Sequence, residues 1–488
     1  MRRGYHLFIT IQKSIYGACE KIGSSAIINS KEEAKCEVIE MNQLEMSLNV
    51  PEVKGVVESL PSKPAEVRLR KPIRNQVEMI LRDLDSMVAE DHPVRAIWDF
   101  LQRLELTDFY SSIRALLDSP GRPASDPRVL LALWVYATVD GVGSARRLDK
   151  LCREHDIYRW LCGGVPVDYH TLADFRTAHQ EALEKLLTEI VATLMSQKLV
   201  TLKKVAQDGV RVRAGAGGGS FHRRENLERC LVEAEEQVKR LSEEREHPDP
   251  EVSQRERAAR ERAARERVER VEAALRQLPA VQAAKKRQEH TLNKTKRSKI
   301  TEARVSMTDP EVRVMKMPDG GWRPAYNVQL ATDVDSGVIV GASVVNRGND
   351  SGQGEAMEAQ VARRSGVHPE AYLIDGGYAQ RDTVTTLTQR QVTVYAPVRP
   401  PMTTTSGRER HSPRWDDSPE VVVWRQRMET EEAKSIYKLR AATAEWANAQ
   451  VRHHGLTRFT VRGLSKALNI VLLVAIAHNL LRWLALAA

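Results

Sequence analysis

Apolar residues recur every three or four positions through the first clearly patterned part of the chain. Over 92–106 they fall at helical spacing, which predicts an amphipathic helix. A more continuous apolar run over 126–139 predicts a second helix, and Pro127 suits its first turn because its missing N–H is not needed there. We therefore expect a set of short helices in this part of the chain.

A glycine turn separates the second helix from a basic one. Gly141 and Gly143 interrupt the apolar pattern, and Ser144 can cap the next helix, which we expect to run to about His155. A helix, a turn and a basic helix resemble a helix-turn-helix arrangement, in which the second helix contacts DNA. The alternative is an ordinary helical bundle with a solvated basic face. The basic residues are Arg146, Arg147, Lys150 and Arg153.

The last helix of this region is predicted from a signal at its N-terminus. Thr171 and Asp174 form a T-x-x-D pattern, which resembles a capping box and predicts a long helix ending near Gln197. We interpret residues 65–200 as an all-α DNA-binding domain. Residues 1–64 show no clear long periodicity, and we interpret them as a poorly determined, partly disordered extension.

The segment 224–300 is dominated by charged residues. Glu and Arg recur at spacings of three and four over 255–267, which supports an exposed helix. Pro248 and Pro250 divide the segment into two arms, so we expect an antiparallel helical hairpin inserted into its domain. Its charges mainly serve solvation, although the basic stretch 285–299 could contact phosphates.

Patterns typical of β-strands flank this insertion. The run 202–212 predicts one strand, and 322–332 and 338–346 predict a hairpin with its turn at 335–337. The segment 201–487 is therefore predicted to be an α/β domain interrupted by the charged insertion. In chain order we then expect a helix at 352–364, a strand at 370–374, a helix from Asp382, a strand at 392–396, a loop at 398–418, and helices at 430–452 and 464–486.

The charge balance is mildly basic. The 488 residues include 74 Lys and Arg against 65 Asp and Glu, a formal net charge of +9. Such an excess suits a polyanionic partner such as nucleic acid, although a chain with 28% charged residues can carry it for solubility alone.

The cysteines favour a reducing compartment. Five of them are scattered along the chain, an odd number with no C-x-x-C pair, so a disulfide framework is not expected. We expect a cytoplasmic, nucleoid-associated protein, and we recognise no secretory signal. Cys152, His155 and Cys162 could be read as zinc ligands, but the spacing lacks a fourth ligand and favours buried thiols on helices.

The most apolar run of the chain lies at its C-terminal end, over 467–486. It contains Asn469, His478, Asn479 and Arg482, which a lipid-facing helix would have to bury without partners. The pattern therefore predicts a buried core helix rather than a membrane span.

Three acidic residues stand at related places in the α/β pattern. Asp208 lies on the first strand, Asp375 ends the fourth, and Glu445 lies on a helix after the last strand. Clustered carboxylates are what Mg²⁺ needs, because it takes oxygen ligands. Two such ions about 3.5–4 Å apart can activate an attacking hydroxyl and stabilise a leaving oxygen at phosphorus. Gly209, and Gly376 with Gly377, would let a DNA backbone approach.

Other acidic residues compete for this role. We interpret Asp335 as a turn residue and Asp382 as a helix cap. Asp333 lies in a loop of the same domain. Asp350 is the remaining alternative, with a supporting role near the site as its expected function.

Several segments together resemble the DDE transposases of bacterial insertion sequences. The segment 437–445 reads Y-K-L-R-A-A-T-A-E and is similar to the Y-R-E signature of that family. The segments V-A-Q-D-G-V-R-V-R-A at 205–214 and Y-L-I-D-G-G-Y at 372–378 resemble the surroundings of its two aspartates. Further similar motifs are R-P-A-Y-N-V-Q, N-D-S-G-Q, H-P-V-R-A-I-W and G-R-P-A-S-D-P-R-V-L-L-A-L-W, so that the resemblance covers about 65–487.

The resemblance implies an α/β RNase H-like catalytic domain with a helical insertion, preceded by an all-α DNA-binding domain. It implies Asp208, Asp375 and Glu445 as metal ligands, with Mg²⁺ as the ion and Mn²⁺ as a substitute. Tyr437 and Arg440 match the signature residues that hold DNA phosphate near the site. Arg452 stands where the signature has lysine, and the spacing from Arg440 to Glu445 is one residue longer than the commonest form, a turn of about 100° on a helix.

The family implies binding of terminal inverted repeats, hydrolysis at the transposon end and attack of the freed 3′ hydroxyl on target DNA. Two ends must be brought together, so we expect a homodimer or higher assembly on DNA, and no membrane. Two alternatives stay open. One is an RNase H-like nuclease that cuts without strand transfer, and the other is a non-catalytic DNA-binding relic of a transposase.

Overall fold

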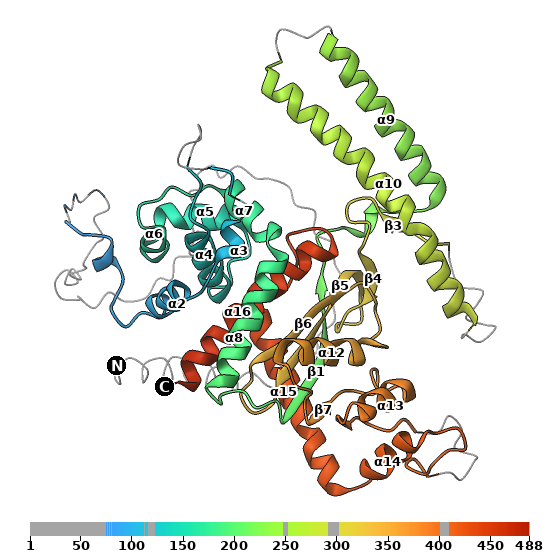
Figure 1. Ribbon diagram of the computed structural model, residues 1–488. Coiled ribbons are helices and arrows are strands. Elements are labelled where there is room, and N and C mark those ends of the chain that lie inside the picture. The colour runs from blue at the N-terminus through green and yellow to red at the C-terminus, as the bar shows by residue number, and fades with distance from the viewer. Residues whose placement is uncertain are drawn as a thin grey trace, which may run out of the picture. The chain divides into compact units, whose positions relative to one another are not determined.

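A six-stranded mixed sheet forms the centre of the part of the protein after residue 203 in the computed structural model (Figure 1). The structure describes residues 81–111, 113–115, 123–246, 252–290, 302–400 and 409–487, together with 75, 77 and 79. Residues 83–488 belong to one compact unit, and the predicted extension 1–64 lies outside the described residues.

The strand order of the sheet is β4-β5-β1-β7-β8, with β6 paired to β5 on the same side as β4. β1 is antiparallel to β5 and parallel to β7, which is parallel to β8. The predicted strands are confirmed, whereas β4 and a separate short pair, β2 and β3, were not predicted. The strands are β1 (Lys204–Arg213), β2 (Phe221–His222), β3 (Val305–Ser306), β4 (Arg313–Lys316), β5 (Trp322–Asp333), β6 (Ile339–Val345), β7 (Ala371–Leu373) and β8 (Thr393–Tyr395).

The turn between β5 and β6 is set by two residues. Gly337 has a φ of +71°, which favours glycine, and Asp333 accepts hydrogen bonds from the backbone N–H and the hydroxyl of Ser336. A β-carbon on Gly337 would stand 2.8 Å from the ring of Trp446, so the absent side chain also lets a helix approach. The predicted turn at 335–337 is confirmed.

Helices cover both faces of the sheet. Gln207 of β1 bonds the backbone of Gln353 in α12, whereas its neighbour Asp208 bonds α15, and successive residues of a strand point to opposite faces. The helices are α12 (Gln353–Ser365), α13 (Arg381–Gln389), α14 (Pro419–Arg427), α15 (Glu431–His453) and α16 (Leu464–Leu486). The prediction of Asp382 as a cap is wrong, because Gln380 holds the N-cap position of α13. α14 was not predicted.

The N-terminal region is helical as predicted, with most start signals confirmed. Asp126 caps α4 by accepting from the N–H of Arg128, and Ser144 caps α5 by accepting from Arg147. α2 ends four residues earlier than the predicted 106. The elements are η1 (Asp85–Met87), α2 (Pro93–Gln102), α3 (Thr107–Tyr110), α4 (Pro127–Val139), α5 (Ala145–Glu154), α6 (Asp156–Cys162), α7 (Tyr169–Ala178) and α8 (Gln180–Ser196).

The predicted capping box of Thr171 and Asp174 is wrong. Asp168 is the cap, three residues before the predicted one, because its carboxylate accepts from the N–H groups of His170 and Thr171. The expected single long helix is also divided. His179 leaves helical geometry, with φ −112° and ψ 47°, so that α7 ends there and α8 begins.

α16 is a core helix. Among the described residues it is the one helix long and apolar enough to cross a membrane, yet 67% of its most apolar window is buried within the protein. It packs against α8, α4 and β6, and Asn479 bonds both the N–H and the carbonyl of Ile339. His478, Asn479 and Arg482 have hydrogen-bond partners inside the protein, whereas the side-chain amide of Asn469 is buried with none in the described structure. The burial of the helix confirms the prediction of a core helix.

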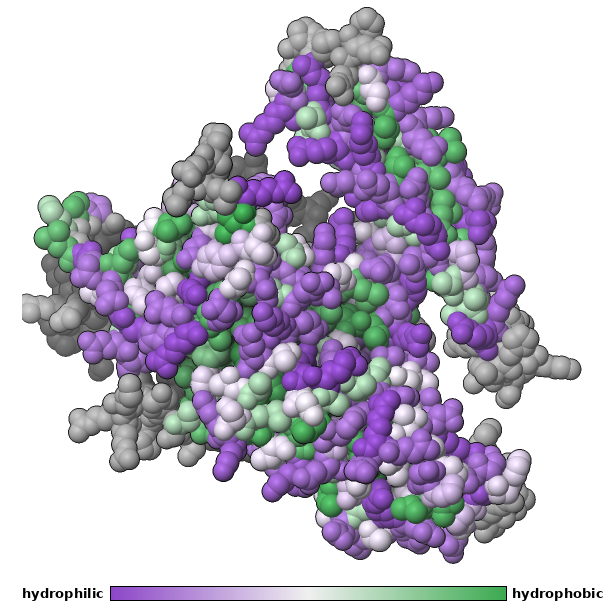
Figure 2. Space-filling view, viewed as in Figure 1, coloured by the Kyte–Doolittle hydropathy of each residue, from purple (hydrophilic) through white to green (hydrophobic). Residues whose placement is uncertain are grey.

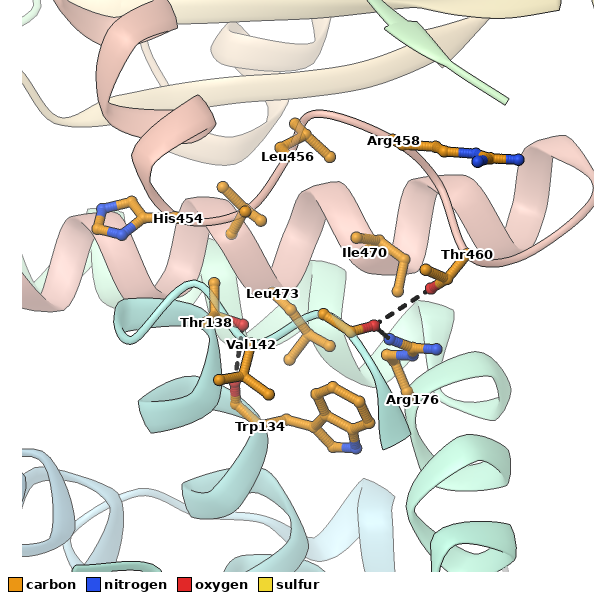
Figure 3. Close-up of a pocket in the computed structure, with 13 residues that line it drawn as sticks. Trp134, Thr138, Val142, Arg176, His454, Leu456, Arg458, Thr460, Ile470 and Leu473 are labelled. Carbon is orange, nitrogen blue, oxygen red and sulfur yellow. Dashed lines mark hydrogen bonds between the residues drawn. The ribbon is translucent and has the colours of Figure 1, made fainter. Parts of the chain in front are cut away.

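The turn before α5 lies against the loop that follows α15 (Figure 3). The carbonyl of Gly143 accepts from Arg176 at 2.6 Å and from the hydroxyl of Thr460 at 3.2 Å. Gly455, with φ +83°, comes so close that a β-carbon there would be 3.1 Å from the carbonyl of Gly141. A cavity of about 30 Å³ remains between Trp134 of α4 and α16. One hydrophobic core consequently runs from the N-terminal helices into the sheet.

The charged insertion forms two long helices that pack against each other, α9 (Arg224–Glu246) and α10 (Gln254–His290), side by side and antiparallel in Figure 1. They share a small core of their own with β3, around Leu227 and Val271. In Figure 2, hydrophilic side chains cover most of the visible face of this helical hairpin. The helical hairpin is as predicted, while Pro248, Pro250 and the basic residues after 290 lie outside the described residues.

Candidate active site

At the centre of the sheet, two of the predicted carboxylates lie near the same arginine side chain. Asp208 lies on the central strand β1, and Asp375 follows the neighbouring strand β7. A terminal guanidinium nitrogen of Arg440, from α15, lies 2.7 Å from Oδ1 of Asp208 and 3.9 Å from Oδ2 of Asp375. Residues more than 60 positions apart in the sequence thus meet at one point.

Asp208 is held from two directions on α15. Arg440 contacts one carboxylate oxygen, and the amide of Asn448 donates to the other at 3.0 Å. Burial raises the pKa of Asp208, and the positive charge of Arg440 lowers it only in part. A buried carboxylate of this kind gains from a cation, because a nearby positive charge stabilises its charged form.

Asp375 is oriented by its own loop. The N–H of Gly377 donates to its Oδ1 at 2.6 Å, which leaves Oδ2 toward Arg440. Its side chain is 38% exposed, compared with 25% for Asp208. The site therefore opens to solvent on the side of Asp375.

Glu445 is not brought into contact with the two aspartates in this structure. Arg440, Ala444 and Asn448 recur every four residues, so they share the face of α15 that contacts β1. Glu445 lies about 100° further round the helix and is exposed. Within the described part of the chain, no three His, Cys, Asp or Glu side chains are grouped to hold a metal ion.

The other residues predicted from the resemblance to the signature lie on the same helix. Tyr437 is half-buried one turn before Arg440, and burial raises the pKa of its hydroxyl while Arg440 lowers it. Arg452 is exposed in the last turn of α15. Tyr437 therefore borders the two aspartates, whereas Arg452 lies three turns beyond Arg440.

Gly209 serves a different purpose from the predicted approach of DNA. A β-carbon there would lie 2.6 Å from the amide nitrogen of Gln329 and 2.8 Å from oxygens of both Asn327 and Asp350. These contacts are shorter than any real β-carbon makes, so the protein's own side chains fill the space. Gly376 would meet Pro397 at 3.5 Å, which is also a protein contact.

A buried polar network that was not predicted supports this centre from the opposite face of the sheet. The amide of Gln207 donates to Gln329, and the hydroxyls of Tyr372 and Tyr378 donate to these two amides. Both glutamines are fully buried. The sequence did contain a signal, namely amide side chains within strands that are otherwise apolar, because such groups are buried only with partners.

The site suits a hard divalent cation. Its donors are carboxylate and amide oxygens, the ligands that such ions prefer. The side-chain oxygen of Asn448, whose nitrogen bonds Asp208, is buried with no hydrogen-bond partner in the described structure. The guanidinium already marks a place where positive charge is favourable between Asp208 and Asp375.

The predicted DNA-contacting residues of α5 are exposed. Arg146, Arg147 and Lys150 face solvent, and the guanidinium of Arg146 lies over the ring of Tyr169 at 5.3 Å. Lys150 has an exposed carboxylate, Glu154, at 3.6 Å, so its charge is weakly held. The thiols of Cys152 and Cys162 are buried and free, as predicted.

Comparison with known families adds two matches. Residues 82–178, which include α2 to α7, match the family described as "Transposase domain (DUF772)". Residues 405–484, which include α14, α15 and nearly all of α16, match the "Transposase DDE domain". No curated protein and no solved structure matched the chain.

The two matches agree with the architecture. A DDE domain implies an RNase H-like fold, which the mixed sheet with helices on both faces accommodates. The matched segment carries Arg440 and Asn448, while Asp208 and Asp375 lie outside it. The helical part of the chain is therefore similar to one transposase domain family, and its C-terminal part is similar to a transposase DDE domain family.

Proposed function

We propose that this protein binds the terminal inverted repeats of a mobile element, cleaves DNA at its ends and joins those ends to target DNA. The observation that carries the proposal is the meeting of Asp208 and Asp375 around Arg440 at the centre of the sheet. Two carboxylates from adjacent strands and a phosphate-binding cation from a helix form a site for phosphoryl transfer.

Asp208 and Asp375 would hold the divalent cation, Mg²⁺ or Mn²⁺. When bound, such a cation activates a water or hydroxyl and stabilises the leaving oxygen at phosphorus. The chain's own residues then position the DNA. Arg440 can turn a second nitrogen toward a phosphate, because its guanidinium is planar and carries several donors. Tyr437, next to it, offers a hydroxyl for the same phosphate.

Glu445 would join the two aspartates when DNA is bound. It lies on the same helix as Asn448, three residues away, and Asn448 already bonds Asp208. A rotation of α15 by about 100° against β1 would bring the glutamate to the edge of the site. We therefore keep Glu445 as the third proposed ligand, with its role to be tested separately from the aspartates.

The basic helix α5 would contact the transposon end. Its exposed cations, Arg146, Arg147 and Lys150, follow a buried helix and a glycine turn, the arrangement by which one helix is presented to DNA. Cleavage and joining at two ends require two sites, so we propose that the active form is a dimer or higher assembly on DNA in the cytoplasm.

The test is a Mg²⁺-dependent cleavage assay on DNA that carries the element's own flanking ends. Wild type is compared with Asp208→Asn, Asp375→Asn and Glu445→Gln, and Asp335→Asn in the exposed turn after β5 serves as the matched control. We expect wild type and the control to cut. All three site variants should bind the DNA ends with unchanged affinity and lose cleavage, because each change keeps shape and removes one negative charge.

Each other outcome assigns a different function. Binding to the ends without cleavage in Mg²⁺ or Mn²⁺ would identify a DNA-binding relic. Cleavage without joining of a pre-cut donor end would identify an RNase H-like nuclease. Full cleavage by Glu445→Gln alone would remove Glu445 from the site and leave the aspartates in place.

A further inference from the structure

A pocket lined by arginines lies where α13 and α14 pack side by side (Figure 1). Its volume is about 370 Å³, and it opens to solvent, because two residues of its wall are exposed. The loop that carries Asp375 leads into it, since that loop ends at Gln380, the N-cap of α13 and part of the pocket wall. The charged and aromatic residues of the wall are Arg381, Asp382, Arg399, Arg414, Trp424 and Arg425.

Two of the four arginines are neutralised by the protein itself. The carboxylate of Asp417, whose side chain is fully buried, lies 2.6 Å from Nε of Arg425 and 3.3 Å from Nε of Arg381. Arg381 also pairs with Asp416. The two acids directly precede Ser418, the N-cap of α14, so they fix both arginines in the wall of the pocket.

The other two arginines leave the pocket with positive charge. Arg399 donates to the carbonyl of Gly376 from Nε at 3.2 Å and from Nη2 at 2.7 Å, and a carbonyl does not neutralise it. Among the described residues, no carboxylate forms an ion pair with Arg399 or Arg414. The exposed carboxylate of Asp382 offsets part of this charge, so the four arginines exceed the three nearby acids by one.

Two buried donors in the same wall have no acceptor. Arg425 is 3% exposed and Trp424 is 4% exposed, yet Nη1 of the guanidinium and Nε1 of the indole have no hydrogen-bond partner in the described structure. Both nitrogens can only donate, so the missing partner is an acceptor. Buried donors are rarely left unpaired, because they have lost their bonds to water. An anionic oxygen in the pocket would supply what both groups lack.

The N-terminus of α13 adds to the attraction for an anion. The helix has nine residues, and Gln380 at its N-cap makes no side-chain capping bond. The first N–H groups of a helix have no partner within the helix and carry partial positive charge. The wall of the pocket therefore combines unpartnered donors, excess positive charge and a helix N-terminus, which together are typical of a phosphate site.

We propose that this pocket binds a phosphate group of the DNA strand that enters the candidate active site. Arg399 belongs to the pocket and bonds the carbonyl of Gly376, the residue after Asp375, so the pocket and the active site share one loop. A strand that reaches Asp375 would pass the pocket with its next phosphates. The planar guanidinium groups suit this ligand, because they donate two parallel bonds to a phosphate. The assignment to DNA rests on the proposed function, whereas a free phosphate would offer the same oxygens.

The first arm of the test uses inorganic phosphate alone, with the full-length protein and no DNA or metal. Phosphate is titrated and its line width followed by phosphorus NMR. Arg414→Gln removes one charge and keeps the backbone N–H that bonds Asp417. Arg425→Lys keeps a charge for Asp417 and removes the unpartnered nitrogen. Arg363→Gln is the matched control, because Arg363 is exposed in the last turn of α12, away from the pocket.

We expect Arg414→Gln and Arg425→Lys each to weaken phosphate binding by at least about tenfold, since each loses a bond between a charged donor and the anion. The Arg363→Gln control should bind as wild type does. No line broadening with wild type, or unchanged affinity of both folded variants, would overturn the inference. Should Arg425→Lys be unfolded by circular dichroism, the Arg414→Gln titration decides.

The second arm asks whether the phosphate belongs to DNA. Binding of the labelled DNA ends is measured by fluorescence anisotropy at several salt concentrations. Arg414→Gln should reduce the slope of log K against log salt by about 0.9, the change for one lost phosphate contact. Weaker phosphate binding with an unchanged slope would overturn the assignment to DNA and identify a free phosphate as the occupant.

Failure of the inference is distinguishable from failure of the proposed function. If wild type cuts DNA while both arginine variants bind phosphate and DNA as it does, only the pocket loses its role. If wild type never cuts in Mg²⁺ or Mn²⁺, yet the variants lose phosphate binding and the slope falls, then the proposed cleavage is wrong and the phosphate site stands.

Discussion

The acidic centre of the sheet and the helical hairpin α9–α10 both abound in charged residues, but they use them differently. On α10 several arginines pair with glutamates four residues earlier, as in Arg260 with Glu256 at 2.8 Å, and both of these side chains are about half exposed. At the centre, Arg440 bonds Asp208 from 232 positions away, and it is 15% exposed. Charge content alone therefore does not mark a site.

The difference lies in solvation and in sequence separation. Exposed pairs within one helix contribute roughly 0.3–0.5 kcal/mol, because water and salt screen them. A partly buried pair that joins distant segments exists only when the whole domain is folded, and loss of one partner leaves the other charge without compensation. Substitutions should therefore have large effects at the centre and small ones on the hairpin.

The largest contrast is expected from removal of an arginine at the centre. Arg440→Gln should lower the rate of DNA cleavage by about 10²–10³-fold, because it removes a preorganised positive charge beside the reacting phosphate. Arg260→Gln on the hairpin should leave the rate unchanged. The measurement is single-turnover cleavage with saturating Mg²⁺. Equal rates for wild type and Arg440→Gln would show that the charged residues at the centre, like those of the hairpin, take no part in cleavage.

The next effect concerns a buried histidine and pH. Burial lowers the pKa of His478, on α16, from 6.5 to about 4. Between these two pKa values His478 is protonated in the unfolded chain but neutral in the folded one. The free energy of unfolding therefore falls as the pH falls through this window. For this one group the free energy of unfolding should drop by about 2 kcal/mol between pH 7 and pH 5.

His478→Gln keeps a donor for the carbonyl of Gly337 and should remove this part of the pH dependence. The measurement is urea unfolding of both proteins at pH 7 and pH 5. His453, exposed at the end of α15, provides the matched control as His453→Gln, for which the pH dependence of wild type is expected. A dependence retained in His478→Gln would assign the acid sensitivity to other buried groups.

The basic helix α5 tests whether exposed charges can matter without stabilising the fold. Replacing Arg146, Arg147 and Lys150 by Gln should leave the thermal midpoint within a few degrees and weaken binding to the transposon end. Each lost phosphate contact should reduce the slope of log K against log salt by about 0.9. An unchanged slope, measured by fluorescence anisotropy at several salt concentrations, would favour the solvated bundle without DNA contact.

The smallest effect is expected on the hairpin itself. Glu256→Gln removes the partner of Arg260 and should change the free energy of unfolding by no more than about 0.5 kcal/mol. The same denaturant series as above measures it, with 0.5 M salt as a second condition, in which the difference should vanish. A loss of several kcal/mol would show that the hairpin's surface charges are part of a larger buried interface.

Local signals predicted most of the elements in this protein. The position of Pro127 in the first turn of α4, the cap at Ser144, the turn at 335–337 and the apolar helix α16 depend on neighbours within a few residues, and the structure confirms them. The failures involve competing local groups. Asp168 offered a better cap than Thr171, because its carboxylate reaches two N–H groups at once.

The candidate site divides in the same way. Asp208, Asp375 and Arg440 were identified from motifs, and the fold brings them together. The role of Gly209 could not be read from the sequence, because it depends on the contact of β1 with β5. The longer spacing from Arg440 to Glu445 already indicated that the glutamate is turned away from the arginine, but its exposure also depends on how α15 packs against β1.

The sequence by itself determined the order of helices and strands, the carboxylates that can serve phosphoryl transfer and the helix that presents basic residues. These follow from periodicity and residue chemistry, which act over short stretches of chain. Only the tertiary structure decided which carboxylates meet, since Asp208 and Asp375 are brought to one arginine by the pairing of β1 with β7 and the packing of α15 on β1. The physical reason is that a strand or helix specifies the spacing of its own side chains, whereas the packing of the core specifies which faces come together.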